Sequence, residues 1–283
     1  MTKEPMRDIV YVEHEGRPLK LDLFLPEDSE LPCPVVVWVC GGGWQGGGKD
    51  LFPDHWFVES GIAVAAIDYR LSAVRAFPAA IEDVQTAVCW LRAHAKQYRI
   101  DPNRMGAWGS SAGGHLTALL GTSAGVKNWS VPKQLADQSR EVQAVCDVNG
   151  PSLLSRMAEP ELKKAYARLY QVVSSFLGGP IEDRMTLAKE ASPLTHVHRG
   201  CPPFLIFHGT ADTVVPFDEG VLLHKALEKA GVDVEFHAMQ GEGHGYTMPA
   251  IMAMNRKTLE FFVRVLKPAS GGARCASLHS WQE

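Results

Sequence analysis

The sequence predicts a doubly wound α/β fold, in which helices cover both faces of a mostly parallel sheet. Short apolar runs alternate with segments of helical periodicity along most of the chain. Glycine and proline residues bound the apolar runs, as is typical of strands buried on both faces of a parallel sheet. A length of 283 residues with 46% hydrophobic content is also sufficient for one large core.

The elements follow in a regular order. The chain opens with an expected antiparallel hairpin, because residues 8–12 and 19–25 alternate in hydrophobicity and Gly16 lies between them. Buried strands are then expected where apolar runs occur, at residues 35–40, 62–68, 105–109, 142–148 and 204–208. A further strand is expected at residues 234–238. Helices are expected between or after them, at residues 77–95, 116–120, 221–230 and 251–266.

Two regions interrupt this alternation. Residues 151–195 show helical spacing without a clear strand, which predicts an excursion above the sheet and a candidate lid. Residues 268–283 are rich in small and polar side chains, and we expect a disordered tail. The remainder, residues 1–267, is predicted to form a single domain.

Composition limits the possible partners and compartments. The net charge of −4 gives no basic field for nucleic acid or an anionic membrane. The beginning of the chain lacks the apolar run of a signal peptide, and no apolar run is long enough for a membrane span. Six scattered cysteines form no Cys-x-x-Cys pair, and His196 and His198 have no third ligand at a useful spacing. We therefore expect a soluble cytoplasmic protein without a metal, although a trimmed secreted form would look the same.

A glycine-rich loop, residues 41–48, follows the first buried strand and fits three interpretations. Gly41, Gly43 and Gly46 match a dinucleotide fingerprint, with Asp68 in the place of the ribose-binding acid. The same loop resembles a phosphate loop, except that Asp50 replaces the serine or threonine that would bind magnesium. Alternatively, its backbone N–H groups form an oxyanion hole beside a nucleophile. The loop alone does not distinguish these possibilities.

The nucleophile motif Gly-x-Ser-x-Gly occurs twice, around Ser111 and around Ser123. This motif needs a strand before it and a helix after it, so that the serine is exposed on a sharp turn. Only Ser111 has that context, whereas Ser123 lies where the helix after the first copy ends. Ser111 is therefore the candidate nucleophile.

A serine hydroxyl becomes a good nucleophile only when a base takes its proton and a carboxylate orients that base. Asp212 lies in the loop after the strand at 204–208, and His244 lies in a glycine-rich loop after the strand at 234–238. The order Ser, Asp, His, with each residue following a strand, is the order of one large hydrolase class. Glu242 is too close to His244 in sequence to be its expected partner.

The remaining histidines have expected structural roles. His208 is expected to support the loop of Asp212, and His115 to pack behind the nucleophile. His237 is expected to belong to a strand. Two acids close to Asp212, Asp218 and Glu219, suit the first turn of the following helix.

With these residues in place, the sequence resembles the α/β-hydrolases of the esterase/lipase class, specifically bacterial feruloyl- and acetyl-esterase-like enzymes related to the hormone-sensitive lipases. The resemblance extends over roughly residues 8–266, and its motifs are residues 41–44, 68–72, 77–83, 108–115, 191–193, 208–216 and 243–245. It implies an eight-stranded α/β-hydrolase sheet with an antiparallel N-terminal hairpin and a small helical lid.

The resemblance also implies functional roles. Ser111 would be the nucleophile, Asp212 the acid and His244 the base. The oxyanion donors would be the backbone N–H groups of Ala112 and of Gly42 or Gly43. Trp44 is the expected substrate contact. One hydrolase site accounts for all these motifs, which neither a dinucleotide loop nor a phosphate loop does.

Cys40 departs from the family pattern, which has a histidine before the glycines. That histidine braces the oxyanion loop, so the loop here is expected to rest on other contacts. A cysteine at the end of a buried strand, with no cation next to it in sequence, is expected to keep a high pKa. Replacement by histidine should be tolerated unless the protein has closed around the thiol.

The leading functional hypothesis is a serine carboxylic ester hydrolase without a cofactor. Its expected substrates are short-chain or carbohydrate-linked esters of the acetyl or feruloyl type, cleaved through an acyl-enzyme. An amide hydrolase, either an arylformamidase or a peptidase of the prolyl-oligopeptidase type, is the alternative. A non-catalytic binding protein on the same fold is a third possibility.

Overall fold

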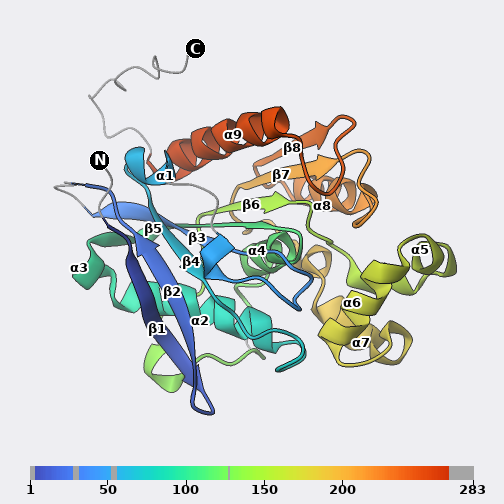
Figure 1. Cartoon of the computed structure of the whole chain (residues 1–283), viewed down its shortest axis with the longest axis horizontal. Helices are drawn as coiled ribbons and strands as arrows, with labels where there is room; N and C mark the ends of the chain where they lie inside the picture. Colours follow the sequence, from blue (N-terminus) through green and yellow to red (C-terminus); the bar gives the residue numbers. More distant parts are fainter. Residues whose placement is uncertain (1–3, 28–31, 52–55, 127, 268–283) are drawn as a thin grey trace.

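The computed structural model describes residues 4–27, 32–51, 56–126 and 128–267, and it confirms the predicted fold class. In these residues eight strands form one sheet in the order β1-β2-β4-β3-β5-β6-β7-β8 (Figure 1). The strands are β1 (Met6–His14), β2 (Arg17–Phe24), β3 (Cys33–Val39), β4 (Ala63–Ile67), β5 (Ile100–Ser110), β6 (Ala144–Val148), β7 (Phe204–Gly209) and β8 (Val234–Met239). The predicted tail, residues 268–283, lies outside the described residues.

Strand direction follows the predicted pattern. The hairpin β1–β2 is antiparallel and joins the sheet through antiparallel pairing of β2 with β4, whereas β4, β3, β5, β6, β7 and β8 are mutually parallel. The strand order reverses between β3 and β5, because the chain adds β4 on one side of β3 and β5 on the other. Ligands of open α/β sheets bind at the carboxyl edge next to such a reversal.

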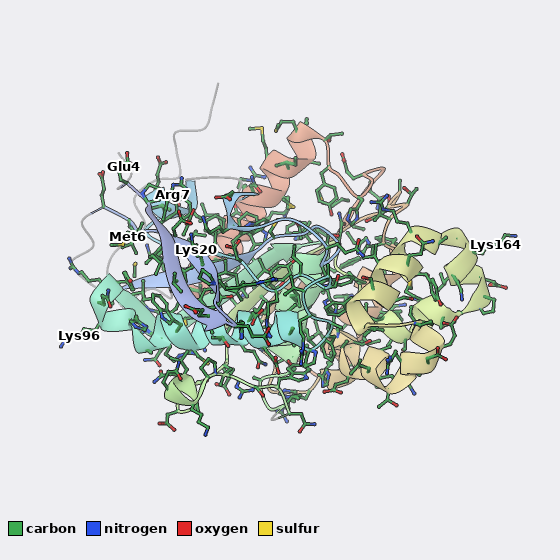
Figure 2. The ribbon with its side chains drawn as sticks, turned by 60° about the horizontal axis from the view of Figure 1, so that its bottom comes forward. Glu4, Met6, Arg7, Lys20, Lys96 and Lys164 are labelled. Atoms are coloured by element: carbon green, nitrogen blue, oxygen red, sulfur yellow. The ribbon has the colours of Figure 1, made fainter. Side chains whose placement is uncertain are left out.

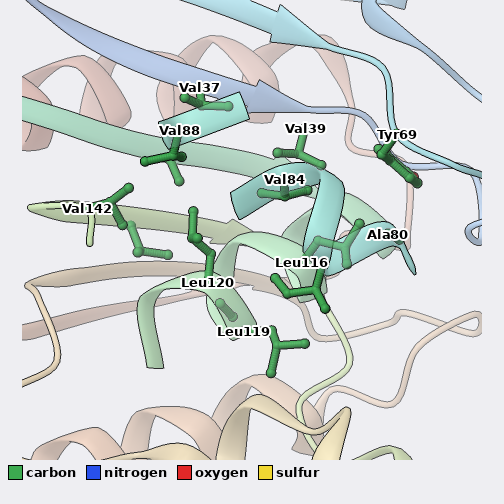
Figure 3. Packing of buried hydrophobic residues seen from close by; sticks show 14 of the residues in the cluster. Val37, Val39, Tyr69, Ala80, Val84, Val88, Leu116, Leu119, Leu120 and Val142 are labelled. Atoms are coloured by element: carbon green, nitrogen blue, oxygen red, sulfur yellow. The ribbon is translucent and has the colours of Figure 1, made fainter. Parts of the chain in front are cut away.

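Helices cover both faces of the sheet. Helices α2 (Ala79–Ala93), α3 (Ala95–Tyr98), α4 (Ala112–Thr122) and α8 (Asp218–Lys229) pack on one face. Figure 3 shows part of this core, where Val84 and Val88 of α2 and Leu116 of α4 meet Val37 and Val39 of β3. Helices α1 (Trp56–Glu59) and α9 (Met248–Leu266) pack on the other face.

The core under α9 is aromatic. Trp38 and Trp108 are partners across β3 and β5, and their ring centroids lie 4.6 Å apart. Phe57 of α1 and Phe262 of α9 pack on these strands. A Cβ built at Gly106 would lie 2.6 Å from the Phe262 ring, so only glycine at this position of β5 lets α9 approach this closely.

Two boundaries differ from those predicted by more than three residues. β5 begins at Ile100 and not at residue 105, because its first half is polar and partly exposed and therefore shows no apolar run. α4 begins at Ala112 and not at residue 116, although Gly113 and Gly114 disfavour helix locally. A Cβ on Gly113 would lie 2.0 Å from the Val39 carbonyl oxygen, so close packing on the sheet requires these glycines. The short helices α1 and α3 were not predicted.

The predicted helical excursion is present. It contains α5 (Pro160–Ala165), α6 (Ala167–Leu177) and α7 (Met185–Glu190), which lie together beyond one end of the sheet in Figure 1. Its apolar side chains are continuous with the core around α4, and the Phe77 amide donates to the Phe176 carbonyl at 2.8 Å. The buried Glu219 carboxylate accepts from the amides of Ser152 and Leu153 at 2.8 and 2.7 Å. The excursion is therefore firmly joined to the main body.

No helix in the described residues is long and apolar enough to cross a membrane.

Candidate active site

Ser111 occupies a sharp turn between β5 and α4. Its φ of 55° and ψ of −121° are unusual for a residue other than glycine, and they hold the side chain out at the carboxyl edge of the sheet. The Ser111 amide donates to the Val148 carbonyl at 2.7 Å, which fixes the turn against β6. A Cβ on Gly109 would lie 2.4 Å from the Gly113 carbonyl oxygen, so the motif glycines allow the strand and helix to meet.

The structure brings the three predicted residues Ser111, His244 and Asp212 together. His244 Nε2 lies 2.9 Å from Ser111 Oγ, and His244 Nδ1 lies 2.7 Å from Asp212 Oδ2. The histidine side chain is 24% exposed, whereas the aspartate side chain is fully buried. A neutral imidazole oriented in this way can take the serine proton while the carboxylate stabilises the imidazolium that forms.

Asp212 is held for this role by its own loop. Its Oδ1 accepts from the amides of Val214 and Val215 at 2.8 and 2.9 Å, which leaves Oδ2 for His244. Burial by itself raises the pKa of Asp212, but hydrogen bonds from His244 and Val215 outweigh it and keep the pKa below its ordinary value. The acid is therefore ionised at neutral pH.

His208 supports the same loop, as expected. Its Nε2 lies 3.2 Å from the Val215 carbonyl oxygen and 3.6 Å from Asp212 Oδ2. Burial lowers the pKa of His208, which keeps the ring neutral beside the acid. The fully buried His115 behaves similarly: its Nε2–H donates to the Ala191 carbonyl at 2.7 Å, and burial lowers the pKa of the ring to about 4.

Asn149, which sequence reasoning missed, connects the loops that carry these groups. It follows β6, adopts a positive φ of 54°, and is 3% exposed. Its Nδ2 donates to the His244 carbonyl at 2.9 Å, while its Oδ1 accepts from the Gly209 amide at 3.0 Å and the Tyr246 hydroxyl at 2.8 Å. The positive φ, which asparagine tolerates better than most residues, leaves no signal in the sequence pattern.

The predicted oxyanion donors lie on two segments beside Ser111. Ala112 is the first residue of α4, and Gly42 and Gly43 lie in the loop after β3 with φ values of 122° and 61°. In the described residues, the backbone N–H groups of these three residues donate to no protein acceptor. They are therefore available to an oxygen bound in front of the serine.

The glycine loop rests on contacts other than the missing histidine. The Tyr69 hydroxyl, which is buried, donates to the Cys40 carbonyl at 3.0 Å. Within the loop, the amides of Gln45 and Gly46 donate to the Gly42 carbonyl at 3.1 and 3.2 Å. The Ser72 amide donates to the Trp44 carbonyl at 2.7 Å. Tyr69 thus braces the start of the loop from the segment that follows β4.

Cys40 is almost fully buried, and burial raises the pKa of its thiol, as the sequence predicts. Its Sγ would lie 2.9 Å from a Cβ built at Gly47, so the loop has closed around the thiol. This packing favours the outcome in which a histidine at this position is too large.

A cavity of about 590 Å³ lies in front of Ser111 and His244. Trp44 belongs to its lining but is only 1% exposed, because its ring stacks on Phe176 with centroids 4.4 Å apart. That Trp44 contacts the substrate stays a prediction. The ring also meets His115 edge to face, so Trp44 joins the glycine loop to α4 and α6.

The other singled-out residues lie away from the cavity. Ser123 is buried at the end of α4 and donates to the Leu119 carbonyl, consistent with the choice of Ser111. His237 lies on β8 and stacks on Phe207. His196 Nε2 contacts the Glu190 carbonyl. No group of three potential ligands with metal-site geometry occurs in the part of the chain that the structure describes.

Comparison of the sequence with models of known protein families assigns the chain to a family. The BD-FAE family model matches residues 21–227, which is most of the chain. The chain belongs to the BD-FAE family. It is thus an α/β-hydrolase of the esterase class, and both the family resemblance and the fold predicted from the sequence are confirmed.

Individual relatives agree with this assignment. Esterase LipC of Mycobacterium tuberculosis is 31% identical over 81% of this chain and 57% of its own length. A solved carbohydrate esterase from gut microbiota has a TM-score of 0.79 and 25% identity, covering 94% of this chain and 97% of the other. Esterase Est2 of Thermogutta terrifontis, solved with propionate bound, has a TM-score of 0.75 and 30% identity, covering 98% and 96%. The chain spans between about half and two thirds of the first curated relatives.

Proposed function

We propose that this protein hydrolyses carboxylic esters by a two-step acyl transfer through Ser111. The observation that carries the proposal is the continuous hydrogen-bonded series from Ser111 Oγ through His244 to Asp212, at 2.9 and 2.7 Å. The esterase relatives support the same reaction class. No step of this mechanism needs a cofactor.

In the first step Ser111 Oγ bonds to the ester carbonyl carbon while His244 Nε2 takes the hydroxyl proton. The carbonyl oxygen becomes an oxyanion, which the N–H groups of Ala112 and of Gly42 or Gly43 stabilise. Collapse of the intermediate breaks the bond to the alcohol, which leaves with the proton from His244. Water then repeats the sequence on the acyl-enzyme and releases the acid.

We propose short-chain or carbohydrate-linked acyl esters, of the acetyl or feruloyl type, as the substrates. One structural neighbour is described as a carbohydrate esterase, and another was solved with propionate. We also propose that residues 1–267 act as one domain, in which the excursion at 151–195 serves as a lid over the cavity. Its α6 residues Leu169 and Val172 line the cavity, which supports that role.

The first test compares Ser111→Ala with Ser123→Ala on 4-nitrophenyl acetate and butyrate. Removal of the nucleophile should lower kcat by about 10⁴-fold or more. Ser123→Ala is the matched control, because the same hydroxyl is removed from the second motif copy, and most activity should remain. If both folded variants lose turnover equally, Ser111 is not the specific nucleophile.

A substrate panel then separates the alternatives. Acetylated xylan, methyl ferulate and 4-nitrophenyl acetate test the ester classes, and aminoacyl anilides and formyl anilides test amide hydrolysis. Cleavage of the anilides without cleavage of any ester would overturn the proposal in favour of an amide hydrolase. Absence of turnover on every substrate would favour a binding protein.

A further inference from the structure

The cavity has two chemically different walls, with Ser111 between them. Trp38, Trp108, Val148 and Met254 form an apolar wall that belongs to the core under α9. The opposite wall belongs to the core on the other face of the sheet and includes Leu169 of α6. An ester placed at Ser111 therefore has one moiety against each wall.

Arg168 gives the α6 wall a permanent charge. Among the described residues that line the cavity, Arg168 is the one Lys or Arg side chain, and none is Asp or Glu. The one histidine in this lining is His244. The guanidinium carries five N–H donors in a planar fork that matches a carboxylate. A cavity wall with a cation and no facing acid favours an anionic group over a neutral one.

Arg168 also lacks a protein partner, unlike neighbouring basic residues of the excursion. Lys163 pairs with Glu182 at 2.7 Å, and Arg156 pairs with the buried Glu219 at 3.3 Å. In the described residues, Arg168 makes no hydrogen bond or ion pair, and its side chain is exposed toward the cavity. Its donors are therefore not used to stabilise the fold.

Helix geometry places Arg168 near the reacting centre. Arg168, Leu169 and Val172 of α6 line the cavity, and Arg168 and Val172, four residues apart, are neighbours on one face of the helix. A Cβ built at Gly43 would lie 3.0 Å from Val172 Cγ1, so this face touches the oxyanion loop. Arg168 is one turn away, or about 6 Å along the helix axis. Its side chain can thus meet a group a few bonds from the ester carbonyl.

We propose that Arg168 forms a subsite for a carboxylate, so that the preferred substrates are esters with an anionic group on the moiety facing α6. This inference rests on the proposed ester hydrolysis and names its substrate class. The carboxylate could belong to the acyl part, as in a monoester of a dicarboxylic acid, or to the alcohol part, as in a hydroxy-acid or uronate ester.

The experiment uses two pairs of esters, each with a charged and a neutral member. Monoethyl glutarate and ethyl pentanoate place the carboxylate on the acyl side, and 4-acetoxybenzoate and phenyl acetate place it on the alcohol side. The ratio of kcat/KM for the charged and neutral members is measured for the wild type and for Arg168→Gln. Comparing ratios cancels the intrinsic reactivity of each ester.

Lys164→Gln is the matched control, because it removes one positive charge from the same excursion. Lys164 lies on α5 and is exposed, and Figure 2 shows it at the outer tip of the molecule, away from the sheet. It does not belong to the cavity lining. Glutamine favours helix about as well as lysine and arginine do, so both variants should fold.

We expect Arg168→Gln to lower the charged-to-neutral ratio about tenfold in one of the two pairs, and that pair identifies the moiety that faces α6. Lys164→Gln should change the ratio less than twofold. Raising the ionic strength should reduce the wild-type ratio, because salt screens the attraction.

A ratio that Arg168→Gln leaves unchanged in both pairs, while the neutral esters are hydrolysed, would overturn the carboxylate subsite alone. An equal loss in Lys164→Gln would also overturn it, because the effect would then be long-range charge. Failure of the wild type to hydrolyse any of the four esters would instead refute the proposed function and the subsite with it.

Discussion

Asn149→Ala tests whether the connection between the three active-site loops positions His244. The substitution removes three hydrogen bonds, to the His244 carbonyl, the Gly209 amide and the Tyr246 hydroxyl. Each contributes about 1 kcal/mol in a buried setting. Alanine also tolerates the positive φ of this position less well than asparagine, at a cost of roughly 1 kcal/mol.

The expected loss of stability is therefore on the order of 3–4 kcal/mol, which should lower Tm by roughly 6–15 °C for a domain of this size. The catalytic effect should be separate from this loss. A histidine displaced by about 1 Å reduces the rate by as much as 10²-fold, so we expect kcat on 4-nitrophenyl acetate to fall between about 10- and 100-fold. KM should change less than kcat, because the hydrogen bonds that are lost hold the loop of the base.

Tyr246→Phe serves as the comparison, because it removes one of the three hydrogen bonds and leaves the contact to the His244 carbonyl intact. We expect a loss of about 1 kcal/mol and less than a fivefold change in kcat. The assays are thermal denaturation and steady-state kinetics at a temperature where both variants are folded. If Asn149→Ala keeps kcat within twofold of the wild type while Tm falls, Asn149 stabilises the fold without positioning the base.

Two further predictions concern Cys40 and Asp147. Cys40→Ala should keep at least a tenth of wild-type kcat/KM, since Tyr69 braces the Cys40 carbonyl and not its thiol, and complete inactivation of the folded variant would contradict this expectation. Cys40→His should lower the free energy of unfolding by about 1–3 kcal/mol, because Gly47 lies against the thiol and leaves too little room for an imidazole. Burial raises the pKa of Asp147 to about 7, because the ionised carboxylate is less stable in the core than in water. Its ionisation therefore lowers the free energy of unfolding increasingly as the pH rises from 3.8 to about 7, and by a constant amount above that. Asp147→Asn should therefore raise the free energy of unfolding at pH 8 by up to about 4 kcal/mol, and leave it unchanged near pH 3.8. Thermal denaturation at the two pH values measures this, and an equal gain at both would exclude ionisation as the cause.

The sequence by itself determined the fold class and the three residues proposed for catalysis. Buried parallel strands need apolar side chains on both faces, so the strands are visible as continuous runs. Ser111 and Asp212 each follow such a run, His244 follows the strand at 234–238, and the carboxyl ends of parallel strands lie at one edge of the sheet. Local patterns were therefore sufficient to predict that these residues meet. The polar first half of β5 and the glycine-rich start of α4 were not predicted, because packing overrides local preference there.

Only the tertiary structure decided which polar side chains support that site. Asn149 contacts the His244 backbone across 95 positions of sequence, and Tyr69 contacts the Cys40 carbonyl across 29. Asn149 belongs to none of the motifs, and the motif at residues 68–72 does not reveal the partner of Tyr69. Each residue acquires its role from segments that become neighbours on folding. The placement of Arg168 in the cavity wall likewise depends on how α6 packs on Gly43. Hydrogen bonds and ion pairs act over a few ångströms in space. The sequence therefore shows which polar and charged groups are present, but not which of them meet.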